Sequence, residues 1–195
     1  MKRIALGALA GLMVSIVAGC TMAPVNRNPH ADDPLVPVAV DLPRYMGRWY
    51  VIASMPMVNE RDYVGNYAVW TLRADGRIED AVVGRRQGFD QPESGSTFIA
   101  VPEHGARDSV WKVHPFWPFE IVVFTAYVDP DYEYTVRATP DKDSAWILSR
   151  HPDMREQVYR SVLTQLDAMG FDTTRFKRIP QFPEQLGQPG FYAPR

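Results

Sequence analysis

Short runs of alternating apolar and polar residues fill the middle of the chain and are separated by turn residues such as Pro, Gly and Asp. The runs cover 48–55, 66–73, 77–85, 96–101, 109–114, 121–128, 132–139 and 144–149. A period of two is typical of strands that bury one face. About eight such strands at regular spacing predict an all-β fold, an antiparallel sandwich or barrel, rather than alternating strands and helices.

Two local features refine these strands. Asp75-Gly76 lies between two runs, which is a strong hairpin signal. In the first run the alternation is expected to place four apolar side chains on one face of the strand: Trp49, Val51, Ala53 and Met55.

The hydrophobic period changes after residue 150. Apolar residues then recur at spacings of three and four: Met154, Val158, Val162, Leu166 and Met169. Pro152 stands where a first-turn proline is tolerated, and Gly170 follows as a stop signal. The pattern predicts one helix over 152–169 with an apolar face packed on the outside of the sheet. A short extended segment over 171–179 and an irregular, Pro-rich tail over 181–195 are expected after it.

The first twenty residues predict export. Lys2 and Arg3 precede an apolar stretch over 4–18 that is too short for a comfortable membrane span, as in a secretory signal peptide. The stretch ends in Val17-Ala18-Gly19-Cys20, which resembles the lipobox of bacterial lipoproteins. That resemblance implies a signal peptide over 1–19 and lipidation of Cys20. An ordinary signal peptide with a chance cysteine is the alternative.

The segment 20–40 is rich in proline and has no period, so it is predicted to be an extended tether between lipid and domain. The alternative is that part of it packs on the domain surface. Thr21 follows Cys20 where an Asp would signal inner-membrane retention, and by analogy with enterobacterial sorting this favours the outer membrane. We take the periplasmic face as the location.

Composition narrows the function classes. The 195 residues carry a net charge of −2, so no basic surplus points to nucleic acid. Aromatic residues make up 12%, which suits a β-rich fold with a large apolar interior. Cys20 is the only cysteine, so its lipidation excludes disulfides, thiol nucleophiles and cysteine-based metal sites.

Three segments resemble the signature motifs of the lipocalin family, and specifically its bacterial outer-membrane branch. Residues 44–50 contain Gly47-Arg48-Trp49, the Gly-x-Trp core of the first motif. Residues 129–132, Asp129-Pro130-Asp131-Tyr132, resemble the second motif, with Val128 in place of its usual leading Thr. Residues 146–150 end in Arg150, as the third motif does. The resemblance covers about 41–180.

The resemblance implies an eight-stranded up-and-down barrel with a closed end and a ligand cup. Trp49 would plug the closed end and Arg150 would pack across it, which is a structural role rather than a catalytic one. Parity counted from Arg150 and the strand alternation then predicts an apolar, aromatic cavity lining: Trp70, Trp111, Val113, Val123, Thr125, Tyr127, Trp146 and Leu148.

No catalytic constellation is predicted. Gly-x-Ser-x-Gly is absent from the sequence, and the histidines His30, His104, His114 and His151 lack the spacing of a zinc site. Glu79-Asp80 and Asp129-Asp131 are acidic pairs. We interpret Asp129-Asp131 as a solvated turn, and neighbours such as Glu79 and Asp80 point to opposite faces of a strand. No metal or cofactor is therefore expected.

The leading hypothesis is a non-enzymatic, membrane-anchored carrier that stores or transports fatty acids or lysophospholipids during envelope maintenance or stress. The first alternative is a lipocalin-fold enzyme that acts on a lipid, although family enzymes of that kind use a cavity cysteine. The second is a structural envelope lipoprotein whose barrel is filled by its own side chains. Because some relatives dimerise, a homodimer also stays open.

Overall fold

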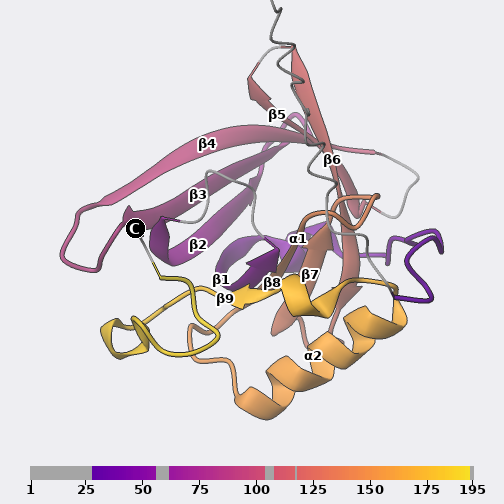
Figure 1. Cartoon of the computed structure of the whole chain (residues 1–195). Helices are drawn as coiled ribbons and strands as arrows, with labels where there is room; N and C mark the ends of the chain where they lie inside the picture. Colours follow the sequence, from indigo (N-terminus) through magenta and orange to yellow (C-terminus); the bar gives the residue numbers. More distant parts are fainter. Residues whose placement is uncertain (1–27, 56–61, 104–107, 117, 194–195) are drawn as a thin grey trace, which may run out of the picture.

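Eight antiparallel strands close into an up-and-down barrel in the computed structural model, which describes residues 28–55, 62–103, 108–116 and 118–193 (Figure 1). The strands follow one another around the barrel: β1 Gly47–Met55, β2 Tyr63–Leu72, β3 Ile78–Arg86, β4 Glu93–Pro102, β5 Val110–Phe116, β6 Phe119–Val128, β7 Tyr134–Ala138 and β8 Ala145–Ser149. Closure follows because β1 pairs with both β2 and β8. The predicted all-β barrel is confirmed.

A β-bulge in β1 explains one wrong expectation. Val51 is paired with Leu148 and Ala53 with Ile147, so Ile52 is an extra residue in β1. The bulge reverses the parity of the strand. Trp49 and Val51 therefore pack inside the barrel, whereas Ala53 and Met55 pack on the helix side. The expectation that all four side chains share one face of the strand was wrong, because the inserted residue moves the side chains after it to the opposite face.

The helix α2, Glu156–Ala168, packs on the outside of β7 and β8, as predicted. Tyr159, Val162 and Leu166 are its buried residues, and they join the outer apolar cluster. The predicted start at residue 152 was wrong, because Arg155 is extended and occupies the N-cap position. Met154 lies in the loop before the helix but packs on the same cluster. Its spacing from Val158 therefore made the helix look longer in the sequence than it is.

Residues 28–41 run along the barrel instead of forming a free tether. Asn28 Nδ2 donates to the Asp167 carbonyl at 2.7 Å, and Lys142 Nζ donates to the His30 carbonyl at 2.9 Å. The tether prediction over 20–40 was therefore wrong from residue 28 onward, and the surface-packing alternative holds there. The predicted signal peptide and Cys20 lie outside the described residues.

Gly170 makes this docking possible. Its φ is +89°, a left-handed conformation that favours glycine, and a Cβ there would lie 1.9 Å from the His30 carbonyl oxygen. The residue predicted as a helix stop therefore also provides the space in which the N-terminal segment packs.

The C-terminal segment completes the barrel wall beyond α2. A short 3₁₀ turn, Thr173–Arg175, precedes β9, Lys177–Arg178, which pairs with β1. Gln181 Nε2 then donates to the carbonyls of Val51 at 2.8 Å and Asn66 at 3.1 Å, and so bridges β1 and β2. The tail predicted to be irregular contains one 3₁₀ turn, Pro183–Gln185.

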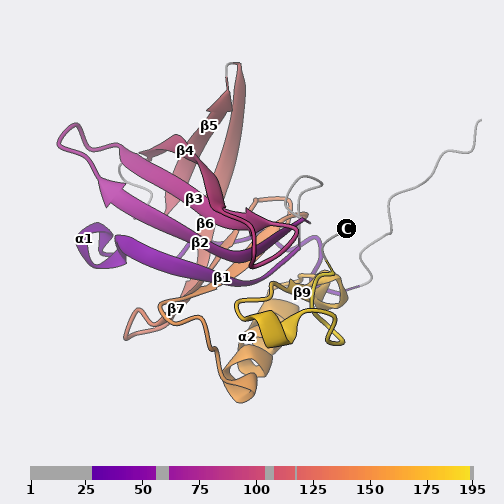
Figure 2. The same ribbon diagram turned by 90° about the vertical axis from the view of Figure 1, so that its left-hand side faces the viewer.

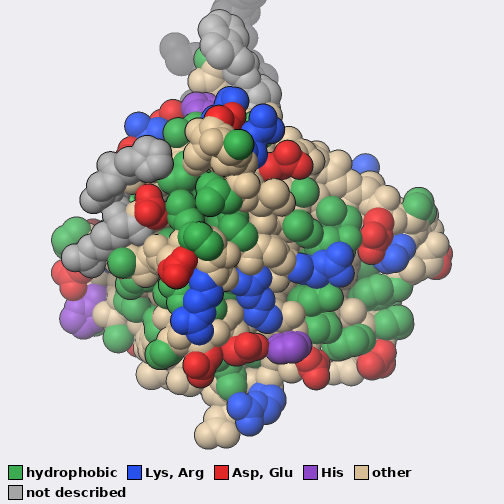
Figure 3. All heavy atoms as spheres, turned by 180° about the vertical axis from the view of Figure 1, so that it is seen from behind, with side chains coloured by type: hydrophobic (Ala, Val, Ile, Leu, Met, Phe, Trp, Pro, Cys, Tyr) green, Lys and Arg blue, Asp and Glu red, His purple; other side chains and the backbone are tan. Residues whose placement is uncertain are grey.

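One end of the barrel is sealed by α1, Leu42–Tyr45, and by the start of β1 (Figure 2). The Arg150 guanidinium carbon lies 3.7 Å from the centroid of the Trp49 ring, which is the contact that the signature motifs imply. Arg150 also donates to the carbonyls of Arg48 and Arg44, both at 2.9 Å. Lys and Arg side chains gather on this face of the molecule (Figure 3).

The remaining signature residues support the same end. Gly47 has a φ of +99°, and a Cβ there would lie 3.3 Å from Arg150 Nη1. Asp129 is buried and accepts from the backbone N–H groups of Tyr134 at 2.7 Å and Asp131 at 3.2 Å. The interpretation of Asp129 as solvated was therefore wrong. Tyr132 accepts from the Asp41 N–H at 2.9 Å and so ties the N-terminal segment to the turn.

We expect Arg150→Ala to lower the free energy of unfolding by about 2–4 kcal/mol, because it removes charge-assisted hydrogen bonds and the contact with Trp49. Urea unfolding followed by tryptophan fluorescence measures the change. Arg160→Ala is the matched control, because the Arg160 side chain is 77% exposed and pairs only with Glu156 in the described chain. Equal effects of the two substitutions would contradict the sealing role.

Candidate ligand-binding cavity

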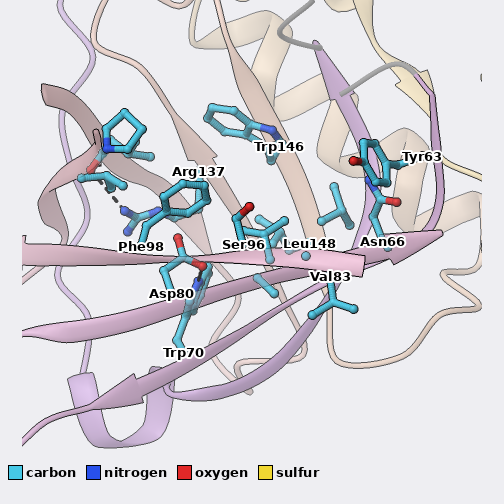
Figure 4. A pocket seen from close by; sticks show the side chains of 18 of the residues that line it. Tyr63, Asn66, Trp70, Asp80, Val83, Ser96, Phe98, Arg137, Trp146 and Leu148 are labelled. Atoms are coloured by element: carbon cyan, nitrogen blue, oxygen red, sulfur yellow. Dashed lines mark hydrogen bonds between the residues drawn. The ribbon is translucent and has the colours of Figure 1, made fainter. Parts of the chain in front are cut away.

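A cavity of about 470 Å³ occupies the barrel above the sealed end. Its walls come from β1 to β8 and from the segment after β9, where Ile179 contributes. Figure 4 shows Trp70, Asp80, Phe98 and Arg137 grouped toward one end, with Tyr63 and Asn66 at the other. The volume lies in the range of sites that hold one small ligand.

Six of the eight residues predicted to line the cavity do line it: Trp70, Trp111, Val113, Val123, Trp146 and Leu148. Thr125 is fully buried below the cavity, where its Oγ1 lies 3.4 Å from the Tyr45 hydroxyl oxygen. Tyr127 lies outside the barrel and stacks on Tyr134, with ring centroids 6.1 Å apart.

A second bulge explains the wrong placement of Tyr127. In β6, Thr125 is paired with Arg137 and Tyr127 with Val136, so Ala126 is an extra residue. The parity counted up to Thr125 is therefore reversed at Tyr127. No sequence pattern around Ala126 marks this insertion.

Aromatic rings form the floor of the cavity. Tyr45 lies between Trp49 and Trp70, with ring centroids 5.4 and 5.0 Å away, and Trp70 meets Trp111 edge-on at 5.1 Å. Offset and edge-on pairs are the favourable geometries for such rings. The large side chains thus fill the closed half of the barrel and leave the other half open.

Arg137 of β7 is the first of two charged groups that line this apolar cavity. It is 4% exposed, and the carbon of its guanidinium lies 3.9 Å from the centroid of the Trp111 ring. Nη1 donates to Thr125 Oγ1 at 2.8 Å and to the Ser109 carbonyl at 3.4 Å, and Nη2 donates to the Val123 carbonyl at 3.2 Å. Burial lowers the pKa of Arg137, although a guanidinium stays protonated in proteins.

Asp80 of β3 is the second charged group. Its Oδ1 accepts from Trp70 Nε1 at 3.0 Å, across a strand pair that places the two residues opposite each other. Burial raises the pKa of Asp80 to about 6, against the opposing effects of the positive charge of Arg137 and the Trp70 hydrogen bond. In the described chain no ion pair joins Asp80 directly to Arg137.

The sequence reasoning missed both charged residues, together with Phe98, Asn66 and Ile179. Asp80 could have been found from the Asp75-Gly76 hairpin, because pairing Leu72 with Ile78 places Trp70 opposite Asp80. Phe98 is then the partner of Asp80 on the next strand. Ile179 belongs to a segment whose path the alternation of the strands does not predict.

Within 28–55, 62–103, 108–116 and 118–193, no three His, Cys, Asp or Glu side chains gather as a metal site. The same residues contain no helix long and apolar enough to cross a membrane.

Comparison with known proteins identifies the family. The family model for the lipocalin-like domain matches residues 40–181. This chain is a lipocalin. It is 31% identical to the outer membrane lipoprotein Blc of Escherichia coli K12 over 144 residues, which covers 72% of this chain and 79% of that protein. The predicted likeness to the bacterial branch, of which Blc is a member, is confirmed.

Other relatives agree. Temperature-induced lipocalin-1 of Arabidopsis thaliana is 32% identical over 151 residues, which covers 73% of this chain and 80% of that protein. Among solved structures, insecticyanin of Manduca sexta superposes with a TM-score of 0.59 at 20% identity, covering 74% of this chain and 83% of that one. At that identity the likeness shows the lipocalin fold alone.

We expect the raised pKa of Asp80 to make the lipocalin less stable as pH rises. Between about pH 4 and 6 the unfolded chain has lost the Asp80 proton and the folded chain retains it, so the free energy of unfolding falls across this window and then levels off. Asp80→Asn should remove that fall. The free energy of unfolding of Asp80→Asn minus that of the parent should therefore be smaller at pH 4 than at pH 7, by about 1–3 kcal/mol.

Urea unfolding at several pH values measures this difference. Asp75→Asn is the control. Hydrogen bonds from Arg77 lower the pKa of Asp75, so this substitution should change the pH dependence of stability in the opposite direction. A difference between Asp80→Asn and the parent that does not change with pH would contradict the burial of this carboxyl group.

Proposed function

We propose that this lipocalin is a non-enzymatic carrier that holds a fatty acid or lysophospholipid in its barrel, and that it is anchored to the bacterial outer membrane through Cys20. The observation that carries the proposal is the cavity of about 470 Å³. An apolar cavity of this size costs stability when it is empty, so a bound amphiphile would stabilise the fold.

The walls above the floor suit an acyl chain. Val113, Ile121 and Leu148 face the cavity from three different strands, and Trp146 adds an indole surface. Apolar contact of this kind is not specific for chain length, because burial contributes in proportion to area. The geometry therefore supports a class of elongated apolar ligands.

The two alternative functions are less well supported. A structural lipoprotein with a filled barrel conflicts with the cavity, because the aromatic rings fill only its closed half. Lipocalin family members are generally binding proteins, which favours a carrier over an enzyme.

We expect Val113→Trp to abolish fatty-acid binding, because the added ring would occupy the cavity. The assay uses full-length protein purified in cholate, which has no acyl chain, and titrates a fluorescent fatty acid. Val101→Trp is the matched control, because Val101 lies on β4 and is 36% exposed. Equal binding by both variants would contradict a site in the barrel.

Organic extraction of the parent protein supplies the second readout. A fatty acid or lysophospholipid at near one-to-one stoichiometry is expected in the extract. An empty protein that also fails to bind the probe would contradict the carrier proposal and favour a structural role.

The docked N-terminal segment supports a membrane-facing mouth. His30 is bonded to Lys142, which lies in the turn between β7 and β8 at the open end of the barrel. Seven residues, 21–27, lie between Cys20 and Asn28, so eight Cα–Cα steps separate the two. They span at most about 29 Å when fully extended. An acylated Cys20 would therefore hold the open end of the barrel close to the bilayer.

We expect a probe at the open end to lie nearer the membrane than one at the sealed end. Gln91→Cys, between β3 and β4, and Ala74→Cys, between β2 and β3, are matched exposed turn positions at opposite ends. A fluorophore on Gln91→Cys should be quenched more strongly by quencher-labelled lipids in reconstituted vesicles.

Cys20→Ala serves as the anchor control for this experiment. It should release the protein from the membrane fraction and abolish incorporation of a labelled fatty acid. Retention of both properties would contradict lipidation at Cys20, and stronger quenching at Ala74→Cys would contradict the membrane-facing mouth.

A further inference from the structure

Two charged side chains, the buried Arg137 and the half-buried Asp80, stand apart from the apolar lining of the cavity. Arg137 and Asp80 lie toward the same end of the cavity in Figure 4, close to Trp70 and Phe98. Burying a guanidinium is costly unless its N–H groups find partners. The bonds that each side chain makes therefore show which of its polar atoms are left for a ligand.

The guanidinium of Arg137 has more donors than partners in the described chain. It carries five N–H groups, of which Nη1 provides two and Nη2 provides two. Thr125, Ser109 and Val123 accept from Nη1 and Nη2 and account for three of these groups. The Tyr45 side chain is a fourth hydrogen-bond partner, so at least one of the five N–H groups has no partner among the described residues. A remaining N–H group of a guanidinium can donate to a carboxylate, and such a charge-assisted bond is stronger than one between neutral groups.

Asp80 offers the complementary atom. Its Oδ1 is bonded to Trp70 Nε1, and Oδ2 has no hydrogen-bond partner in the described part of the chain. Asp80 and Arg137 interact electrostatically but are not in direct contact as an ion pair. Polar atoms of both side chains are therefore left for a group that enters from the cavity.

The charge states of the pair favour an anion. Arg137 stays protonated, whereas Asp80 can take up a proton, so the net charge of the pair is either zero or +1. Tyr45 from α1 is the other titratable group nearby that acts on Arg137. The side chains that β1, β5 and β8 present to this cavity are apolar, among them Val51, Trp111 and Leu148. Nothing in this set makes the site anionic overall.

We propose that the cavity binds a free fatty acid carboxylate-first, with the carboxylate on the guanidinium of Arg137, Asp80 as its second partner, and the acyl chain running toward the mouth. This inference rests on the proposed carrier function and selects the fatty acid over the lysophospholipid. A lysophospholipid with its headgroup at the mouth would place its terminal methyl group against Arg137 and leave the guanidinium without an anionic partner.

Proton uptake accompanies this binding. Asp80 repels a ligand carboxylate when ionised and donates to it through Oδ2 when protonated. Because the pKa of Asp80 is about 6, affinity should rise as pH falls from 7.5 toward 6. The sign is opposite to that expected if the only effect of acid were to neutralise the ligand.

The test compares palmitate, hexadecanol and palmitoyl lysophosphatidylcholine on full-length protein in amphipol, with binding read from tryptophan fluorescence. Arg137→Met should weaken palmitate binding about ten- to a hundred-fold and change hexadecanol binding less than about three-fold. Asp80→Asn should retain palmitate binding and lose its pH dependence. Arg86→Met is the matched control for general electrostatics, because the Arg86 side chain is 67% exposed.

The outcomes separate the two proposals. If none of the three amphiphiles binds the parent protein, the carrier function itself is wrong. If hexadecanol or the lysophospholipid binds and palmitate binding is unchanged in Arg137→Met, the carrier stands and the carboxylate site is overturned. An equal loss for palmitate and hexadecanol would show that Arg137 has only a structural role, which also overturns the site.

A second measurement covers a variant that fails to fold. In isotope-edited NMR of the parent protein, the C2 protons of palmitate should show contacts with the Trp70 and Trp111 rings. Contacts of its terminal methyl group with those rings, together with C2 contacts at Tyr63, would establish the reverse orientation and overturn the proposal.

Discussion

The contact of Arg150 with Trp49 seals one end of the barrel, and the position of the cavity depends on it. A barrel of eight strands has room for one layer of side chains or for one small ligand. Here the largest rings, Trp49, Trp70 and Trp111, gather at the sealed end around Tyr45. The side chains of the other half, Trp146 and Tyr63 among them, line its walls without filling it, so the cavity lies there.

The sequence was informative wherever one local signal determined the structure. Turn residues predicted the eight strands, and Trp49 and Arg150 are in contact as the signature motifs imply. The errors share a physical cause, since the bulges at Ile52 and Ala126 each insert a residue and reverse the strand parity. The position of a bulge depends on how the strand pairs with its neighbours. The local pattern of apolar residues does not indicate it.

The docking of residues 28–41 illustrates the same limit at the level of tertiary contacts. Proline and the lack of a period predicted a tether, and both features remain true of the segment. It is nevertheless held by Asn28 and His30 against groups more than one hundred residues away in the chain. The composition of a segment indicates that it cannot form a helix or strand by itself. Its docking depends on hydrogen-bonding groups of the folded domain and on the space beside Gly170, and neither exists before the domain folds.

Arg137 and Asp80, the two charged side chains that line the cavity, show where the fold departs from what stability alone would favour. A purely structural pair would be expected to meet directly, because a buried ion pair repays part of its desolvation only at close range. Arg137 instead bonds to Thr125 and to backbone carbonyls, and Asp80 bonds to Trp70. Each charge is thus held in place by its own partners while both line the same cavity. Local departures from the rules of stable packing concentrate at functional sites, and this one lies at the bottom of the ligand cavity.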